Sequence, residues 1–342
     1  MHESLYLLFL SALPPVFAGG TIELGVFLDE PFRQEFAAAM KATQGTISLP
    51  TFLNAVLYNV ELLLQPLRLN LSITYLEELE SDPDPEAHGR GHAQRYLDWF
   101  CELQSKRKPQ TWDHAILFSG YNLHRGGGGA DVLKGRAQKG LMCNRRHSCS
   151  VVEVLELDAP YHDEEANCPR RFLMSSALGA GKIQWSSCSY RAYWDLAAKL
   201  RRGPSGNCLT RRDYREAMAL DRSRMPGQVL DEDAQCRLDF RLPGIRSRML
   251  RRVSHPDGIC HLLWCATGPW ARHYGAHPAL EGSYCAQDSW CIKGRCVKFG
   301  EDGPRAVDGA WSSWSTSSNC SPDGCTCPPF PNSRGFCSPA FT

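Results

Sequence analysis

Histidine is the residue type in this sequence that could hold a catalytic metal, and its spacing decides whether it does. In a hydrolytic zinc site of the H-E-x-x-H-x-x-G-x-x-H type, two histidines sit one helical turn apart, so both imidazoles reach one ion. The glutamate takes a proton from the zinc-bound water, the glycine lets the chain turn, and a third histidine completes the ligand set. The chain has 11 histidines that could supply this pattern.

The paired histidines do not supply it. A histidine followed by a glutamate occurs only at position 2. His88 and His92 have the required spacing, but the glycines between them oppose a helix, and no glutamate follows His88. His273 and His277 also lack the glutamate. We expect both pairs to be solvated loop histidines.

The stretch APYHDEEANCPRRFLMSS (159–176) holds the remaining candidate. His162 stands six residues before Cys168 and twelve before Met174. One imidazole cannot hold a catalytic zinc, and only the segment VLELDAPY separates Glu153 from His162. Without further context, a lone His-Asp pair is typical of a protein surface and a lone methionine of a core.

The cysteines indicate the compartment. There are 16, none of them in the first 100 residues, and ten lie in the last 107. An even number crowded into short, loop-rich segments is typical of a disulfide framework in an oxidising environment. Zinc knuckles are the alternative, but they need C-x2-C units, and the sequence contains none.

The N-terminus and the charge agree with secretion. The apolar run from Leu5 to Ala18 is too short to span a membrane and ends in small residues, so residues 1–18 are expected to be a signal peptide. The alternative is a buried N-terminal strand. No other run is apolar for long enough to span. A net charge of +1 gives no reason to expect nucleic acid or an anionic membrane as partner.

Hydrophobic periodicity predicts an α/β domain followed by smaller units. We expect strands at 21–30, 71–79 and 114–120, and helices at 31–40, 49–67, 93–104 and 190–200. In the helix 49–67, Asn54, Asn59 and Glu61 mark a solvent-exposed face, and Pro66 ends the helix. From about residue 213 the elements shorten and the cysteines crowd together. A third region opens near GPRAVDGAWSSWS (303–315).

Together these segments resemble the ADAMTS family, which are secreted metzincin proteases with a disintegrin-like module and thrombospondin motifs. The resemblance covers about residues 21–337, and its motifs include TIELGVFLD, YLDWFCELQ, TWDHAILFSG, HDEEANCPRRFLMSS and GSYCAQDSWCIKGRCV. It implies an α/β metzincin (reprolysin-like) protease-type domain at 19–212. A small disintegrin-like cysteine-rich module at 213–300 and a partial thrombospondin type 1 motif at 301–342 would follow.

The resemblance also implies how twelve cysteines pair. The bridges expected in the protease-type domain are Cys101–Cys149, Cys143–Cys208 and Cys168–Cys188. Those expected in the disintegrin-like module are Cys236–Cys265, Cys260–Cys291 and Cys285–Cys296. The family usually has eight cysteines in this second module, so both ends of one bridge are absent and no odd thiol remains.

For metals, the resemblance implies that His162 is the third zinc ligand and that Met174 is the Met-turn residue beneath the ion. The two other zinc ligands and the general-base glutamate are absent, so no catalytic residue set is intact. Calcium is implied by Glu23 and Asp113, with the carbonyl of Cys208 as a further ligand. The aspartate that the family has shortly after this cysteine is absent.

Candidate modification sites are also present. Asn70 and Asn319 lie in glycosylation sequons. Trp311 and Trp314 match two ladder tryptophans of a thrombospondin motif, and Trp311 lies in the W-x-x-W pattern used for C-mannosylation. Simple anchoring of a small module explains the two tryptophans equally well.

The resemblance implies a monomeric protein that is secreted to the extracellular space or matrix and is able to bind matrix proteins or glycosaminoglycans. We expect the chain as written to be a catalytically inactive pseudoenzyme. The alternative is an active zinc metalloendopeptidase of matrix proteins whose sequence has lost an exon. A third hypothesis, a disulfide-rich adhesive protein without protease ancestry, is disfavoured by the stretch from His162 to Met174 and by the ordered cysteines.

Overall fold

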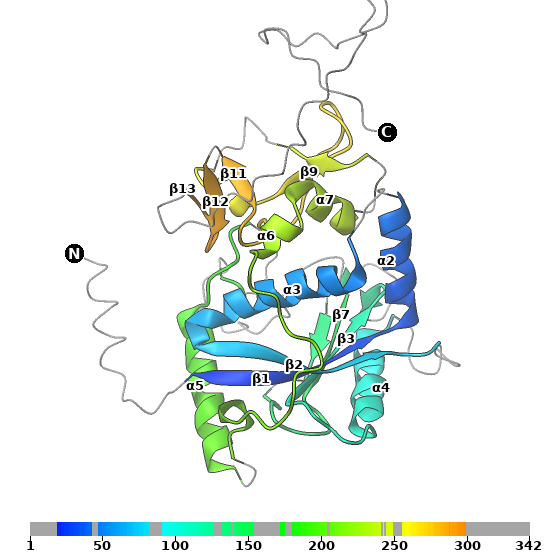
Figure 1. Ribbon diagram of the computed structural model, residues 1–342, viewed down its shortest axis with the longest axis vertical. Helices are drawn as coiled ribbons and strands as arrows, with labels where there is room; N and C mark the ends of the chain where they lie inside the picture. The colour runs from blue at the N-terminus through cyan, green and yellow to red at the C-terminus, as the bar shows by residue number, and fades with distance from the viewer. Residues whose placement is uncertain are drawn as a thin grey trace, which may run out of the picture. The chain divides into compact units, whose positions relative to one another are not determined.

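A five-stranded sheet forms the centre of the N-terminal part (Figure 1). Its order is β2-β1-β3-β7-β6, and the strands span Gly20–Leu28 (β1), Leu69–Glu78 (β2), His114–Ser119 (β3), Gly135–Ala137 (β6) and Cys149–Glu153 (β7). The β2-β1, β1-β3 and β3-β7 pairs are parallel, and only β6 runs antiparallel, at one edge. The strands and helices predicted from periodicity are confirmed, within a few residues at their ends.

The computed structural model describes a defined set of residues. These are 19–42, 47–81, 91–125, 132–133, 135–138, 140–153, 172–174, 180–203, 206–240, 242, 244–248, 255–286 and 288–298. They all belong to one unit of the chain, Met1–Gly303. Predictions for residues 1–18 and 301–342, and for His162, Cys168, Asn319, Trp311 and Trp314, lie outside the described residues.

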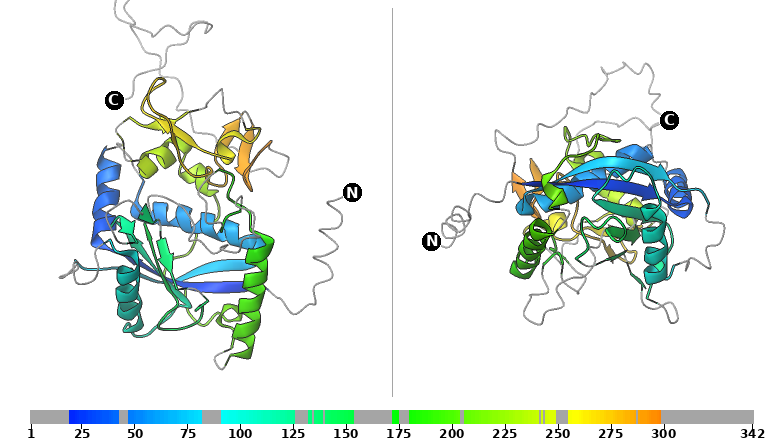
Figure 2. Two further views of the ribbon diagram at one scale, coloured as in Figure 1. Left: turned by 180° about the vertical axis from the view of Figure 1, so that it is seen from behind. Right: turned by 90° about the horizontal axis from the view of Figure 1, so that it is seen from below.

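The central strand β1 is buried along its whole length, because helices cover both faces of the parallel sheet. Residues Val26 and Leu28 pack with Phe52 of α3 (Leu49–Leu64) in one core. Phe27, which points the other way, packs with Phe100 of α4 (Ala93–Ser105) in a second core. Figure 2 shows the two helices on opposite sides of the sheet. Each such fully buried side chain contributes about 1.5–3 kcal/mol.

Two further helices complete the α/β part. They are α2 (Glu30–Ala42) and α5 (Ser187–Arg202). Asp29, directly after β1, joins three elements, because its carboxylate accepts hydrogen bonds from the backbone N–H groups of Phe32 and Gly120 and from the hydroxyl of Tyr96. The shorter elements are η1 (Gln65–Leu67), β4 (Leu123–His124), β5 (Val132–Leu133) and η2 (Cys208–Thr210).

The C-terminal part consists of short elements and two small antiparallel sheets. Its helices are α6 (Pro226–Val229), α7 (Glu232–Phe240) and η3 (Gly258–Cys260). One sheet joins β8 (Arg246–Ser247), β9 (Trp264–Ala266) and β10 (Tyr274–Gly275). The other joins β11 (Tyr284–Ala286), β12 (Ser289–Ile292) and β13 (Arg295–Lys298). None of the helices in the described part of the chain could cross a membrane.

Disulfides cross-link both parts of the described chain. The structure contains the bridges Cys101–Cys149, Cys143–Cys208, Cys236–Cys265, Cys260–Cys291 and Cys285–Cys296. These are the pairs that the family resemblance implies for these ten cysteines. Cys188 is also disulfide-bonded. Closing long loops in this way restricts the unfolded chain, which stabilises small, loop-rich segments.

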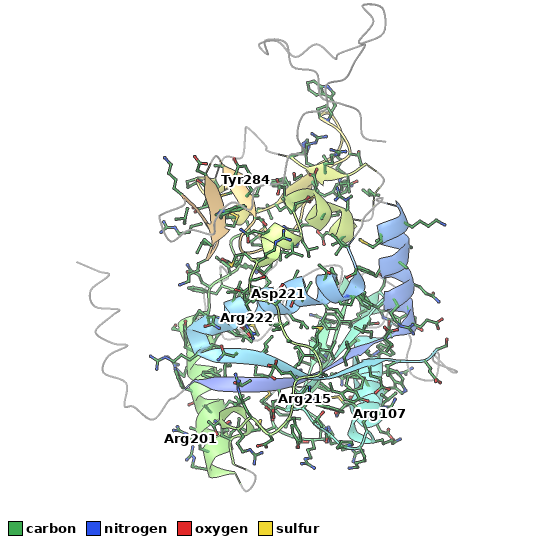
Figure 3. The ribbon with its side chains drawn as sticks, viewed as in Figure 1. Arg107, Arg201, Arg215, Asp221, Arg222 and Tyr284 are labelled. Atoms are coloured by element: carbon green, nitrogen blue, oxygen red, sulfur yellow. A yellow bond between two sulfur atoms is a disulfide. The ribbon has the colours of Figure 1, made fainter. Side chains whose placement is uncertain are left out.

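The prediction that the polar residues of α3 face solvent is wrong for Glu61, which is only 3% exposed. Its two carboxylate oxygens accept hydrogen bonds from Nε and Nη2 of Arg222, each at 2.7 Å. The backbone N–H of Leu71 in β2 donates to the same carboxylate. Figure 3 shows Arg222 beside α3. A buried charge needs such pairing, and its partner lies 161 residues away in the sequence.

The other two polar residues of this face are half-buried and also bonded to the later part of the chain. Asn54 exchanges two hydrogen bonds with the backbone of Asp221, at 3.0 and 2.7 Å. The side-chain oxygen of Asn59 accepts from the backbone N–H of Glu281 at 3.1 Å. The polar residues Asn54, Asn59 and Glu61 of α3 therefore form hydrogen bonds with two later segments of the chain, one around Asp221 and Arg222 and one at Glu281.

Replacing Arg222 by methionine should lower the free energy of unfolding by about 3 kcal/mol at pH 7, because Glu61 would remain as a buried, uncompensated charge. Urea unfolding of R222M measures this loss. The matched control is R202M at the exposed end of α5, which should behave like the wild type. An R222M chain as stable as the wild type would contradict the assigned role of the pair.

The same pair predicts an acid dependence. Burial raises the pKa of Glu61, but the hydrogen bonds from Arg222 and Leu71 outweigh it, so the pKa is lowered from 4.5. A carboxyl group whose pKa is lowered by folding stabilises the folded state above its unfolded pKa. The wild type should therefore lose this contribution as the pH falls below 4.5, and E61Q should lose less over the same range. Equal pH slopes for the two proteins would contradict the prediction.

Candidate functional site

Of the two candidate zinc-site residues, Met174 lies among the described residues. His162 lies outside the described residues. Glu153, the last residue of β7, is buried, and its carboxylate accepts a hydrogen bond from the backbone N–H of Leu123 at 3.3 Å. Met174 is half-buried, and the backbone N–H of its neighbour Leu173 donates to the carbonyl of Gln184. This contact brings the turn around Met174 to the residues that lead into α5.

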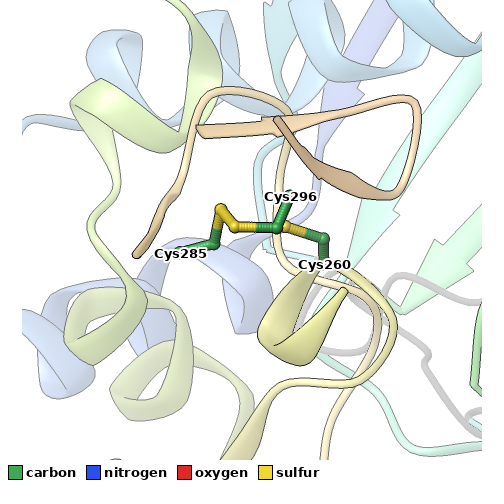
Figure 4. Close-up of side chains that lie close together, drawn as sticks. All are labelled: Cys260, Cys285 and Cys296. Carbon is green, nitrogen blue, oxygen red and sulfur yellow. A yellow bond between two sulfur atoms is a disulfide. The ribbon is translucent and has the colours of Figure 1, made fainter. Parts of the chain in front are cut away.

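One cluster among the described residues has the spacing of metal ligands. It consists of Cys260, Cys285 and Cys296, whose sulfur atoms lie within 4.8 Å of one another. Figure 4 shows these side chains at the base of the β11-β12-β13 sheet. Cys260 is bonded to Cys291, and Cys285 is bonded to Cys296. Metal binding needs free thiolates, so this cluster is a disulfide core and not a metal centre.

The two carboxylates implied as calcium ligands do come together. Glu23 lies in β1, and Asp113 directly precedes β3. The backbone N–H of Glu23 donates to the Asp113 carboxylate at 3.1 Å, and the N–H of Asp113 donates to the Glu23 carbonyl at 2.7 Å. The Glu23 carboxylate accepts from the backbone N–H groups of Asp213 and Tyr214, both at 2.9 Å. Cys208 begins η2, which packs against β1.

The electrostatics of this pair show crowded negative charge. Burial raises the pKa of Glu23 above its ordinary value, and the hydrogen bonds from Tyr214 and Asp213 oppose the shift. Burial also raises the pKa of Asp113 to about 6, and the charges on Glu23 and Asp213 add to the effect. The charge of Arg211 opposes the shift in both groups, and a metal cation among the carboxylates would add to that effect.

Asp213, which sequence reasoning missed, lies beside this pair: its backbone N–H donates to Glu23, and its carboxylate forms an ion pair with Arg211 at 3.3 Å. The resemblance led us to expect an aspartate immediately after Leu209. The aspartate that bonds to Glu23 is instead Asp213, four residues after Leu209. Oxygen donors of this kind suit calcium. However, the carboxylates of Glu23, Asp113 and Asp213 are not all within 4.8 Å of one another. The types of donor atom fit calcium, but the three carboxylates do not surround a single position at which one ion could contact all of them.

The sequon at Asn70 lies in the edge strand β2. Its side-chain oxygen accepts a hydrogen bond from Gln65 at 3.1 Å. Ser72, the third sequon residue, is buried and donates to Glu216. Glycosylation at this position would therefore have to precede folding of the strand, and it stays a prediction.

Calcium should raise the melting temperature of the purified chain if the carboxylate group binds it. At a calcium concentration of 100 times the dissociation constant, the stabilisation would be about 2.7 kcal/mol. D113N should abolish the effect, whereas D195N, at an exposed position of α5, should keep it. Scanning calorimetry with and without a chelator measures the shift. An unchanged melting temperature, or an equal shift in D113N, would exclude the site.

Comparison with known proteins agrees with this architecture. Residues 226–297 match the family model described as ADAMTS cysteine-rich domain 2. The chain is similar to "A disintegrin and metalloproteinase with thrombospondin motifs adt-1" of Caenorhabditis elegans, with 32% identity over 86% of this chain and 22% of that protein. It is also similar to "A disintegrin and metalloproteinase with thrombospondin motifs 18" of Homo sapiens, with 31% identity over 74% of this chain and 22% of that protein.

A third relative is "A disintegrin and metalloproteinase with thrombospondin motifs 7" of Mus musculus, which is 31% identical over 74% of this chain and 16% of its own length. The chain thus spans 16–22% of the length of these curated relatives. The similarity extends well beyond the cysteine-rich segment and includes a mixed α/β part with a parallel sheet. The chain is therefore a homologue of the ADAMTS family over most of its length.

Proposed function

We propose that this chain is a secreted, matrix-associated ADAMTS-type protein whose protease-type domain is catalytically inactive. The observation that carries the proposal is the shortness of the segment between Glu153 and His162. The names of the relatives contain the word metalloproteinase, and such proteases need two further histidines and a glutamate ahead of the third ligand.

The register of β7 supports this proposal. Counting back from His162, the 11-residue zinc pattern would begin at residue 152. Val152 stands there, in a strand, paired with Phe118 of β3 and with Gly135 of β6. A glutamate, Glu156, stands where the second histidine belongs. The segment therefore lacks both histidines, and its first residues pair in the sheet and cannot begin the zinc helix.

The remaining residues do not fit a catalytic zinc ion. His162 offers one imidazole, and Met174 supplies no metal-binding group of the kind that zinc prefers. The general-base glutamate of the family is absent together with its helix. Glu153 falls at that position only when the pattern is counted back from His162; it ends β7, and its buried carboxylate accepts the backbone N–H of Leu123. We therefore derive no hydrolytic step for this chain.

The domain plan belongs to the same proposal. Residues 1–18 would be a signal peptide, 19–212 the metzincin-type domain, 213–300 the disintegrin-like cysteine-rich module and 301–342 a partial thrombospondin type 1 motif. Disulfides in both described parts support an oxidising, extracellular location. Matrix proteins and glycosaminoglycans are the proposed partners, because what remains after loss of catalysis is binding.

The purified full chain, incubated with zinc, should not cleave a quenched-fluorescence peptide library or casein. The matched variants are E153Q and H162A, which should give the same background signal as the wild type. Zinc-dependent cleavage that either substitution abolishes would overturn the proposal.

Sequencing the transcript across the codons for Glu153 to His162 tests the other explanation. We expect a continuous reading frame that encodes only VLELDAPY between these residues. An additional in-frame segment encoding H-E-x-x-H would show that the natural protein is an active zinc endopeptidase.

A further inference from the structure

Two runs of basic residues meet at the C-terminal end of α4. Residues 106–108 (Lys-Arg-Lys) directly follow the helix, and residues 145–147 (Arg-Arg-His) lie shortly before β7. The buried side-chain amide of Gln104, in the last turn of α4, donates to the backbone carbonyls of Arg145 and Arg146 at 3.1 and 3.0 Å. The fold thus places side by side two basic segments that are separate in the sequence.

The second run is held by its backbone. The side-chain amide of Gln110 donates to the carbonyl of Arg145 at 2.6 Å. The side-chain oxygen of Asn144 accepts hydrogen bonds from the backbone N–H groups of Arg146 and His147, at 3.1 and 3.0 Å. Residues 144–147 are all exposed. Because the bonds that fix this run use its backbone, its charged side chains are left at the surface.

The carboxylates that contact the first run are already paired with it. Glu102 accepts from Nζ of Lys106 at 2.7 Å. Glu77 accepts from Nη2 and Nε of Arg107 at 2.6 and 3.0 Å, and Figure 3 shows Arg107 beside the lower end of α4. These two acids therefore offset the charges of Lys106 and Arg107 and leave the third cation of the run, Lys108, without a carboxylate.

Lys108, Arg145 and Arg146 carry the excess positive charge of this surface. None of them forms an ion pair with a carboxylate of the described residues. The pKa of Glu102 is lowered first by its hydrogen bond from Lys106 and then by the charge of Arg146, so the second run acts electrostatically on the first. Cations at the end of a helix stabilise its dipole, which accounts for Lys106 but not for the second run.

This surface has concentrated charge but no apolar centre. The chain as a whole has a net charge of only +1, and the large apolar side chains that are exposed in its described part all lie in other segments. Protein interfaces bury an apolar core, so the surface fits a partner that charge alone can recognise. Clusters of Lys and Arg bind polyanions such as nucleic acid or heparin. The disulfides favour an extracellular location, and thus the sulfated polysaccharide.

We propose that the surface formed by residues 106–108 and 145–147 binds a sulfated glycosaminoglycan. The planar guanidinium groups of Arg145 and Arg146 donate paired hydrogen bonds to the oxygens of a sulfate group, and Lys108 adds a further positive charge. This inference rests on the extracellular location in the proposed function. It selects the polysaccharide among the proposed partners and assigns its site to the α/β part of the chain.

The test is titration of a fluorescently labelled heparin octasaccharide with the purified full chain, followed by fluorescence anisotropy. We expect saturable binding at about 0.15 M salt that weakens at about 1 M, where the Debye length falls from about 8 to about 3 Å. The double variant R145E/R146E should weaken binding at least about tenfold, which corresponds to about 1.4 kcal/mol. The matched control is R201E/R202E, which makes the same charge change in an exposed Arg-Arg pair at the end of α5 and should leave binding nearly unchanged.

The melting transition of each variant separates loss of binding from loss of folding. Absence of octasaccharide binding, or an equal loss in both double variants, would overturn the proposal. Polyglutamate that binds as tightly as the octasaccharide would also overturn it, because an acidic protein segment would then replace the polysaccharide. The peptide-cleavage assay of the proposed function is independent of this titration, so failure of one proposal is distinguishable from failure of the other.

Discussion

The buried carboxylate of Glu61 is the constraint on which much of this structure depends. A negative charge in the middle of α3 can be buried only if it is paired, and Arg222 pairs with both of its oxygens. The pair also contacts β2, because Leu71 donates its N–H to Glu61 and its carbonyl accepts from Arg222. One ion pair thus connects a core helix, an edge strand and the segment that leads to the cysteine-rich residues.

The α/β part and the disulfide-rich part belong to one unit, Met1–Gly303, and this ion pair is one of the links between them. The polar face of α3 is bonded at Asn54, Asn59 and Glu61 to residues far along the chain. The disulfides then hold each part internally. Among the described residues, two cores, one shared with α3 and one with α4, cover the two faces of the sheet.

The spacing of apolar residues predicted the helices and strands. Contacts between residues far apart in the sequence could not be predicted in this way. The helix at 49–67 and the strand at 21–30 follow from the spacing of apolar side chains, which is read within a few residues. The burial of Glu61 could not be read in this way, since its partner is 161 positions distant. The hydrogen bond from the Asp213 backbone to Glu23 spans 190 positions. The candidate zinc ligand His162 was found by family resemblance and lies outside the described residues.

The absence of two zinc ligands remains the central claim about function, and metal content tests it most directly. The full chain would be purified in zinc-containing buffer, dialysed against metal-free buffer and measured by inductively coupled plasma mass spectrometry. The account predicts far less than one zinc ion per chain, because a single imidazole at His162 cannot retain the metal. One tightly held zinc ion per chain, lost in H162A, would contradict it.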